Sequence, residues 1–268
     1  MSHRPWGPRL QARSRRVLKR LVPRRSLGSG DLEGNSGVPE QFLLPLRPGE
    51  QLSVTGILDV RVISGVVEVW GAKILPSLQF QRIVVPDWAP SLRIVAIQPS
   101  SPLPVPEHAE NEEEDILTFL EEQSWPTVLC LQSGSRIDSV PAAKDAPAIA
   151  LREIRGRLSP QEERPRLRAH RVWPSLIEKF SSLVVAPGAD PPVLMVMGGR
   201  GVGKSTCCRF LVNSLLETCG EVFLLETDVG QPELVPPGLV ALHRVREPLL
   251  QVPHSELHRH ECLARFFA

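Results

Sequence analysis

The sequence contains, at residues 193–206, the stretch VLMVMGGRGVGKST, which decides the fold of the second half of the chain. Its apolar run Val193–Met197 is typical of a buried strand, and the apolar periodicity of Cys207–Leu216 predicts a helix. Between them, Gly198–Ser205 fit the pattern G-x-x-x-x-G-K-S. A strand, this loop and a helix are the setting of a phosphate-binding loop, or P-loop. We therefore predict that the chain binds a nucleoside triphosphate.

The chemistry of such loops suggests a role for each residue. The glycines let backbone N–H groups point at the phosphates, and the start of the helix favours anions through its dipole. Lys204 is expected to reach the β- and γ-phosphates, and the Ser205 hydroxyl to ligate Mg²⁺. The expected cofactors are ATP and Mg²⁺. The expected nucleotide-binding residues are those of the whole loop, namely Gly198, Gly199, Arg200, Gly201, Val202, Gly203, Lys204, Ser205 and Thr206.

A second apolar run, Val222–Leu225, predicts the next strand, and Asp228 stands at or just past its carboxyl end. If the strands are parallel, their carboxyl ends meet at one edge of the sheet, and Asp228 lies roughly 5–10 Å from the loop. A carboxylate there can contact Mg²⁺ or accept a proton from an attacking hydroxyl. Together with an amphipathic helix over Trp173–Val185, this order predicts an α/β P-loop NTPase domain. Its parallel sheet is expected to be incomplete at the C-terminus.

The loop and the later stretch ETDVGQPELVPPG at residues 226–238 resemble the polynucleotide 5′-hydroxyl-kinase family. The pattern D-x-G-Q followed by P-P-G is more specific than the loop alone. The resemblance is to the nucleolar branch, which acts in ribosomal RNA maturation, and the related branch is the cleavage-factor RNA kinase of messenger and transfer RNA processing. It implies ATP-dependent phosphorylation of RNA 5′-hydroxyl ends in pre-rRNA processing.

The resemblance also implies a catalytic set of Lys204, Asp228 and Gln231. Lys204 would stabilise charge on the transferred phosphoryl group, Asp228 would orient or deprotonate the RNA 5′-hydroxyl, and Gln231 would lie near the reacting phosphate. Ser205 and Asp228 would hold Mg²⁺. Only about sixty residues follow Lys204, and the arginine-bearing lid of the family has no counterpart before Ala268. The chain is therefore expected to be a fragment or truncated isoform with little activity of its own.

Short runs bounded by Gly, Pro, Asp and Ser predict strands in the first half of the chain. They are Gln41–Leu46, Gln51–Ile57, Val60–Ile63, Val66–Trp70, Arg82–Val85, Leu92–Ile97 and Thr127–Leu131. We predict a small all-β, sandwich-like module over residues 39–140, with an acidic and proline-rich insertion. Residues 1–38 are expected to be a disordered basic arm and linker, 141–172 a second linker, and 173–268 the N-terminal part of the kinase domain.

Composition limits the cellular setting. The net charge is only +1, yet nine basic residues precede the first acidic residue, Asp31. This arm fits a nuclear or nucleolar address with RNA affinity, and a mitochondrial transit peptide or a solvated tail are the alternatives. Five cysteines without framework spacing favour reduced intracellular thiols. The expected partners are RNA with a 5′-hydroxyl end and nucleolar pre-rRNA-processing proteins, and no apolar run is long enough to span a membrane.

Other hypotheses remain open at this stage. The chain can be a non-catalytic nucleolar scaffold with a vestigial P-loop, or an RNA kinase of the cleavage-factor type. A GTPase is disfavoured because the guanine-recognising motif N-K-x-D is not found. His254, His258, His260 and Cys262 suggest zinc, but a polar surface helix is preferred because a second ligand pair is missing. Trp70 and Trp88 can stack on bases, although core positions are preferred.

Overall fold

The computed structural model describes residues 9–12, 22–23, 41–85, 89–98, 127–133, 167–184, 190–251 and 260–267. The chain divides into two compact units. The first consists of Met1–Val69 and Ile74–Leu167, and the second of Trp70–Lys73 and Arg168–Ala268. No helix among the described residues is long and apolar enough to cross a membrane.

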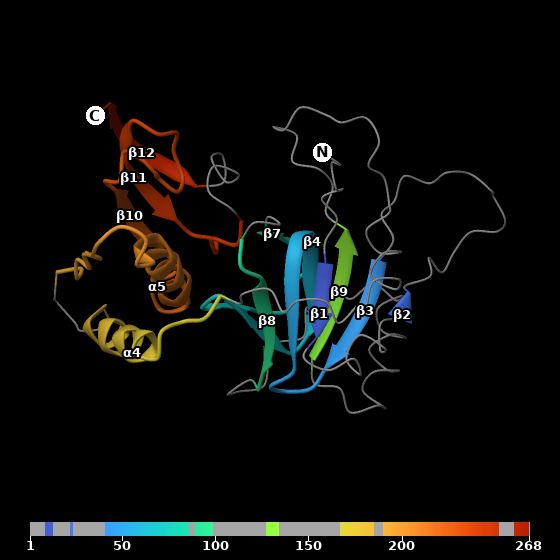
Figure 1. Cartoon of the computed structure of the whole chain (residues 1–268). Helices are drawn as coiled ribbons and strands as arrows, with labels where there is room; N and C mark the ends of the chain where they lie inside the picture. The colour runs from blue at the N-terminus through green and yellow to red at the C-terminus, as the bar shows by residue number, and fades with distance from the viewer. Residues whose placement is uncertain are drawn as a thin grey trace, which may run out of the picture. The chain divides into compact units, whose positions relative to one another are not determined.

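The first unit is built from antiparallel strands (Figure 1). They are β1 (Arg9–Ala12), β2 (Val22–Pro23), β3 (Gln41–Leu46), β4 (Gln51–Ser64), β5 (Val66–Val69), β6 (Ala72–Ile74), β7 (Gln81–Val85), β8 (Leu92–Ile97) and β9 (Thr127–Ser133). Their order is β2-β3-β9-β4-β8-β5-β6, and β1 and β7 also pair with β4. The predicted all-β character of this region is confirmed.

Strand β4 organises the first unit because it belongs to two sets of pairings. Its first part pairs with β1 and β8, and from Gly56 onward it pairs with β7 and β9. The sequence predicted two strands, Gln51–Ile57 and Val60–Ile63, where the structure has one strand of 14 residues. Asp59 accounts for the difference, because it remains inside the ladder and accepts two hydrogen bonds from Arg82 on β7, at 2.8 and 3.0 Å.

Part of the N-terminal arm lies among the residues that the structure describes. The short strands β1 and β2 lie in the segment that the sequence predicted to be disordered. β1 pairs with β4, and β2 pairs with β3. Most of the arm, the acidic insertion and most of the linker over residues 141–172 lie outside the described residues.

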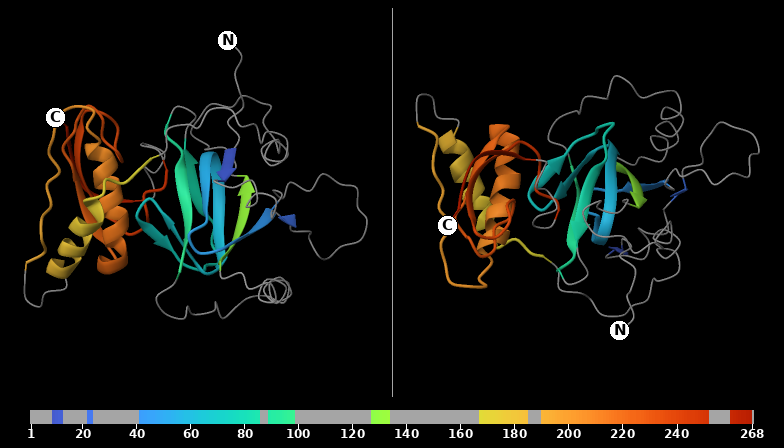
Figure 2. Two further views of the ribbon diagram at one scale, coloured as in Figure 1. Left: turned by 60° about the horizontal axis from the view of Figure 1, so that its bottom comes forward. Right: turned by 90° about the horizontal axis from the view of Figure 1, so that it is seen from above.

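The second unit contains α4 (Trp173–Val184), α5 (Lys204–Cys219), β10 (Val222–Glu226), β11 (Leu239–Val245) and β12 (Glu261–Phe267). Helix α5 lies against the three strands in both views of Figure 2. The core of this unit includes an apolar cluster from the helix, the sheet and the segments before and after β11, comprising Val212, Leu216, Val222, Leu224, Leu234, Val245 and Leu249. The predicted helices at Trp173–Val185 and Cys207–Leu216 are confirmed, with small differences at their ends.

The predicted parallel sheet is not found among the described residues. Strands β10, β11 and β12 pair antiparallel, in that order. The run Val193–Met197, predicted as a buried strand, has no strand structure, and Val193, Met195 and Met197 are 93, 75 and 76% exposed. The reason is that a strand needs the hydrogen bonds of a neighbouring strand, whereas apolar composition alone supplies none.

Trp70 and Gly71 connect β5 to β6 in sequence, and together with Ala72 and Lys73 they belong to the second unit. The Trp70 ring makes edge contacts with Trp173 and Phe210, with ring centroids 6.2 and 5.3 Å away. Its backbone has a φ of 49°, which L-residues rarely adopt, and the next residue, Gly71, has a φ of 83°. The Trp70 carbonyl accepts a hydrogen bond from Nδ2 of the buried Asn213 at 3.1 Å. Trp70 is therefore a core residue, as the sequence favoured, and its partners lie in the second unit.

We expect Gly71→Ala to destabilise the second unit by about 2–4 kcal/mol. A Cβ on Gly71 would lie 2.4 Å from Ser214 Oγ and 2.8 Å from the Phe210 carbonyl oxygen, so helix α5 would have to move. Gly238→Ala is the matched control, because Gly238 has a φ of 91° but nothing within 4 Å of its Cβ position. The measurement is hydrogen exchange of the α5 amides in each variant. Equal protection in the two variants would contradict the close packing.

Candidate functional site

The G-x-x-x-x-G-K-S loop leads directly into helix α5, which begins at Lys204. Gly201 and Gly203 have φ values of 75° and 90°, a region in which glycine carries no steric penalty. Gly203 is the N-cap, and no side chain caps the helix. Lys204 Nζ donates to the Gly199 carbonyl oxygen at 2.8 Å, across the loop. The loop therefore combines uncapped helix amides with one ammonium group, the chemistry that phosphate binding needs.

Two cysteine thiols follow the loop in the first turns of α5. Burial raises the pKa of the Cys207 thiol. Burial, followed by the charges of Cys207 and Glu233, raises the pKa of Cys208 to about 11. Both thiols therefore stay protonated near neutral pH, and a protonated thiol is a poor nucleophile.

The second part of the candidate site is the turn after β10. Asp228 Oδ1 accepts hydrogen bonds from the backbone N–H groups of Gly230 and Gln231, both at 3.1 Å. This local bonding is typical of aspartate in a turn. Asp228 and Gln231 are exposed, and Asp228 Oδ2 has no hydrogen-bond partner among the residues that the structure describes. The turn thus brings Asp228 and Gln231 together and leaves one carboxylate oxygen available.

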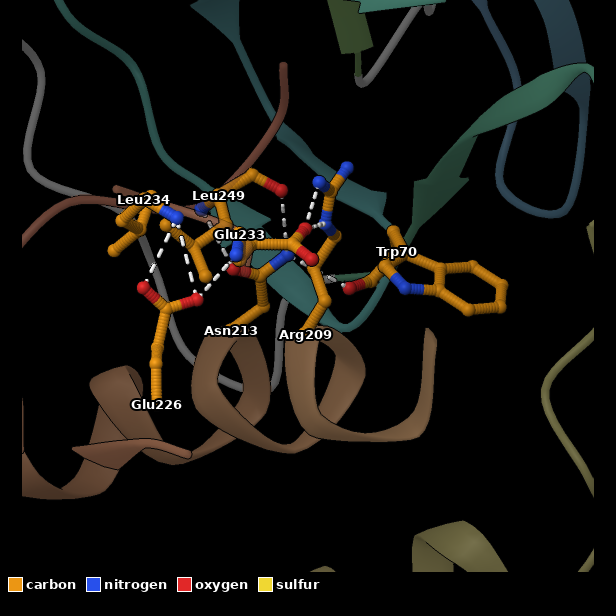
Figure 3. Close-up of polar contacts among 7 residues, drawn as sticks. All are labelled: Trp70, Arg209, Asn213, Glu226, Glu233, Leu234 and Leu249. Carbon is orange, nitrogen blue, oxygen red and sulfur yellow. Dashed lines mark hydrogen bonds and ion pairs between the residues drawn. The ribbon is translucent and has the colours of Figure 1, made fainter. Parts of the chain in front are cut away.

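Three acidic and basic side chains anchor this turn, and sequence analysis assigned them no role. Figure 3 shows Arg209 on α5, Glu226 at the end of β10 and Glu233 beyond the turn. Glu226 accepts hydrogen bonds from the backbone N–H groups of Glu233 and Leu234. Arg209 pairs with Glu233, and its Nε donates to Glu233 Oε1 at 2.6 Å. One feature of the sequence could have indicated a structural role for Arg209, because this charged residue directly precedes the buried apolar residues Phe210-Leu211-Val212 of the helix.

The anchors place the turn beside the N-terminal half of α5. Strand β10 has five residues and so rises about 16 Å, which equals about eleven residues of helix. Because the chain reverses at Gly220, the end of β10 comes level with the part of α5 near Arg209. Lys204 lies five residues earlier, about 7.5 Å along the helix axis. The approach of Asp228 to Lys204 and Ser205 stays a prediction.

The described residues include no group of three or more His, Cys, Asp or Glu that could hold a metal ion alone. Mg²⁺ does not require one, because in kinases it is bound by one or two protein oxygens and substrate phosphates. The exposed Ser205 hydroxyl and the Asp228 carboxylate oxygen without a hydrogen-bond partner supply the oxygen ligands that Mg²⁺ prefers. These residues therefore fit a magnesium ion delivered with a nucleotide.

The segment from His254 to Cys262 was considered as a zinc site, with a polar surface helix as the preferred alternative. His254 and His258 lie outside the described residues. His260 is buried, and Cys262 lies in β12, so the helix predicted for this segment is wrong at Cys262. Trp88 also lies outside the described residues.

Comparison with known proteins shows what the chain is similar to. Residues 198–268 match the family model described as the mRNA cleavage and polyadenylation factor CLP1 P-loop. A polynucleotide 5′-hydroxyl-kinase named NOL9 from Mus musculus is 26% identical over 91% of this chain and 37% of its own length. The NOL9 of Danio rerio is 47% identical over 30% of this chain and 12% of its own length. The GRC3 kinase of Gibberella zeae is 27% identical over 93% of this chain and 34% of its own length.

The chain spans about a third of the length of the mouse and fungal relatives that match most of it. Among solved structures, the complex of wild-type Clp1p with Pcf11p matches with 16% identity and a TM-score of 0.45. The match covers 82% of this chain and 40% of that one.

Proposed function

We propose that this chain, which belongs to the polynucleotide 5′-hydroxyl-kinase family, supplies the ATP-binding part of an enzyme that phosphorylates RNA 5′-hydroxyl ends. The observation that carries the proposal is the pairing of two motifs in one unit. The G-x-x-x-x-G-K-S loop opens α5, and the turn with Asp228 and Gln231 follows the adjacent strand β10. Relatives named polynucleotide 5′-hydroxyl-kinase match the chain over nearly its whole length.

In this proposal the loop residues Gly198–Thr206 bind the triphosphate. The N–H groups at the helix start donate to the phosphate oxygens, and the Lys204 ammonium exchanges the Gly199 carbonyl oxygen for phosphate oxygens. Phosphoryl transfer needs little covalent help from the protein, so positioning and charge neutralisation supply most of the acceleration. Lys204 therefore stabilises the charge that spreads over the transferred group.

Asp228 and Gln231 act on the other reactant. The open oxygen of Asp228 accepts the proton of the RNA 5′-hydroxyl or orients that hydroxyl for attack on the γ-phosphorus. Gln231, which directly follows the glycine of D-V-G-Q, lies near the reacting phosphate. Ser205 and Asp228 would hold Mg²⁺, which when bound neutralises charge on the phosphate oxygens.

The substrate and cellular setting follow from the same resemblance. The basic arm and the match to the nucleolar branch support a role in pre-rRNA processing, in the nucleus and nucleolus, with pre-rRNA-processing proteins as partners. A polycationic segment attracts RNA through its phosphates, and such attraction weakens as salt rises.

The decisive assay measures transfer of γ-phosphate from ATP to a 5′-hydroxyl RNA. It uses this chain and a chimera in which the chain is continued by the remaining sequence of the mouse relative. We expect transfer by the chimera to 5′-hydroxyl RNA and none to the same RNA with a 5′-phosphate, because the acceptor oxygen is then blocked. A parallel reaction with 5′-hydroxyl DNA measures the preference for RNA. A chimera that binds ATP but transfers no phosphate would contradict the proposal and favour the scaffold hypothesis.

A further inference from the structure

We propose that Glu226, Glu233 and Arg209 form a clamp that fixes the turn bearing Asp228 to the helix bearing Lys204. The three are positioning residues for the reaction, because they act through Asp228 and do not themselves contact substrate. This inference rests on the proposed function only for its kinetic consequence. The mechanical part, a turn held by this clamp, is a property of the chain itself.

Glu226 is the fixed point of the clamp. It is 8% exposed, and both of its carboxylate oxygens accept hydrogen bonds from the backbone on the far side of the turn. Oε1 accepts from the N–H groups of Glu233 and Leu234, and Oε2 also accepts from Leu234 N–H at 3.1 Å. A carboxylate that replaces water with several backbone donors makes strong, charge-assisted bonds. The turn from Thr227 to Pro232 is therefore closed at its base by a single side chain.

His243 supports Glu226 from the neighbouring strand β11. Its imidazole is 2% exposed, and its Nε2 lies 3.3 Å from Glu226 Oε2. Neither ring nitrogen has a hydrogen-bond partner in the part of the chain that the structure describes. A buried imidazole next to a carboxylate restricts how far that carboxylate can move. Glu226 thus lies against His243 of β11 on one side and is hydrogen-bonded to the turn on the other.

Arg209 connects the turn to the P-loop helix. Its guanidinium uses two nitrogens, Nε and one terminal nitrogen, on the same oxygen of Glu233. The side chains of Arg209 and Glu233 are 19 and 14% exposed, so water screens the pair only partly. Because Glu233 also donates its N–H to Glu226, one residue connects helix α5 to strand β10. Figure 3 shows these contacts beside the Asn213 contacts that hold the same helix to Trp70 and Leu249.

The clamp matters because, among the described residues, the Asp228 side chain accepts hydrogen bonds from its own turn alone, and the turn has one further backbone bond, from Gly238 N–H to the Val229 carbonyl oxygen at 2.7 Å. The two hydrogen bonds to Asp228 Oδ1 come from Gly230 and Gln231, so they set the shape of the turn and not its distance from the loop. A misplacement of about 1 Å between reacting groups costs about 100-fold in rate. Nucleotide binding, in contrast, depends on the loop residues Gly198–Thr206, with which the clamp side chains make no hydrogen bond or ion pair among the described residues. Loosening the clamp should therefore separate catalysis from nucleotide binding.

The test measures hydrogen–deuterium exchange at single amides in the full 268-residue chain. Glu226→Gln keeps size and shape but removes the charge and one acceptor. We expect the Glu233 and Leu234 amides to exchange about tenfold faster or more, the factor that follows from losing charge-assisted hydrogen bonds. The matched control is Glu221→Gln, which precedes the same strand and pairs with Arg246. There the two amides should keep their wild-type rates.

A second pair of variants guards against simple unfolding by Glu226→Gln. Glu233→Arg alone should speed exchange of the amides at positions 233 and 234, and adding Arg209→Glu should restore their protection, because the swap rebuilds the ion pair. Wild-type protection of the turn in Glu226→Gln would overturn the clamp, and so would a swap that fails to rescue while α5 stays protected.

The kinetic arm uses the chimera, with ATP binding and phosphate transfer measured separately. For Glu226→Gln and Glu233→Arg we expect kcat to fall about 10- to 100-fold while the affinity for ATP stays within twofold. A purely structural role would lower both. If the unaltered chimera transfers no phosphate, the proposed function fails, and the exchange experiment still decides whether the clamp exists.

Discussion

Replacing Lys204 with alanine is expected to lower kcat for phosphate transfer about 10²- to 10³-fold, the usual cost of removing one preorganised charge donor. Lys204 is the first residue of α5, and its ammonium lies across the loop at 2.8 Å from the Gly199 carbonyl oxygen. Arg200 is the other basic residue of Gly198–Thr206, and it lies in the loop before the helix start. The variant should also bind ATP more weakly, because the same ammonium contacts the phosphates in the ground state.

The measurement is single-turnover transfer of γ-phosphate to 5′-hydroxyl RNA by the chimera, at saturating ATP. Lys179→Ala, an exposed lysine on α4, is the control for loss of a positive charge and should leave the rate unchanged. Transfer by Lys204→Ala at the wild-type rate would show that the loop does not carry the chemistry.

Local patterns in the sequence predicted most elements because each pattern reports on burial and turns within a few residues. The runs Gln41–Leu46 and Leu92–Ile97 are strands with the predicted bounds. Helix α5 extends beyond the predicted Cys207–Leu216 because the loop itself supplies its first turn. The same local logic failed at Val193–Met197, where an apolar run lacks the neighbouring strand that would make it part of a sheet.

Contacts between distant residues could not be predicted in this way. Asn213 and Trp70 are separated by 143 positions, and nothing in either neighbourhood points to the other. The clamp could not be predicted for the same reason. Arg209 and Glu233 are residue types typical of a protein surface, and only the folded arrangement of α5, β10 and the turn brings them together. The predicted candidate residues Lys204, Asp228 and Gln231 came from motifs, which preserve chemistry in short segments. The residues that position them came only from the fold.

Asp228→Asn should lower kcat about 10²- to 10⁴-fold, the range for loss of a general base. The substitution suits the structure because an amide oxygen can still accept the bonds that Gly230 and Gln231 donate to Oδ1. The turn therefore keeps its shape while the open oxygen becomes an amide nitrogen, which cannot accept a proton. ATP affinity measured without Mg²⁺ should change little, since the phosphates are bound by the loop at the start of α5 and Asp228 would contribute only through Mg²⁺.

Two measurements on the chimera check this expectation, transfer to 5′-hydroxyl RNA and equilibrium binding of ATP. Asp190→Asn, a change at an exposed aspartate before the loop, is the control and should match the unaltered protein in both. Exchange protection of the Gly230 and Gln231 amides reports whether the turn is intact. If the turn stays protected in Asp228→Asn and transfer proceeds at full rate, the hydroxyl is activated by another group, and the clamp on Asp228 has no catalytic purpose.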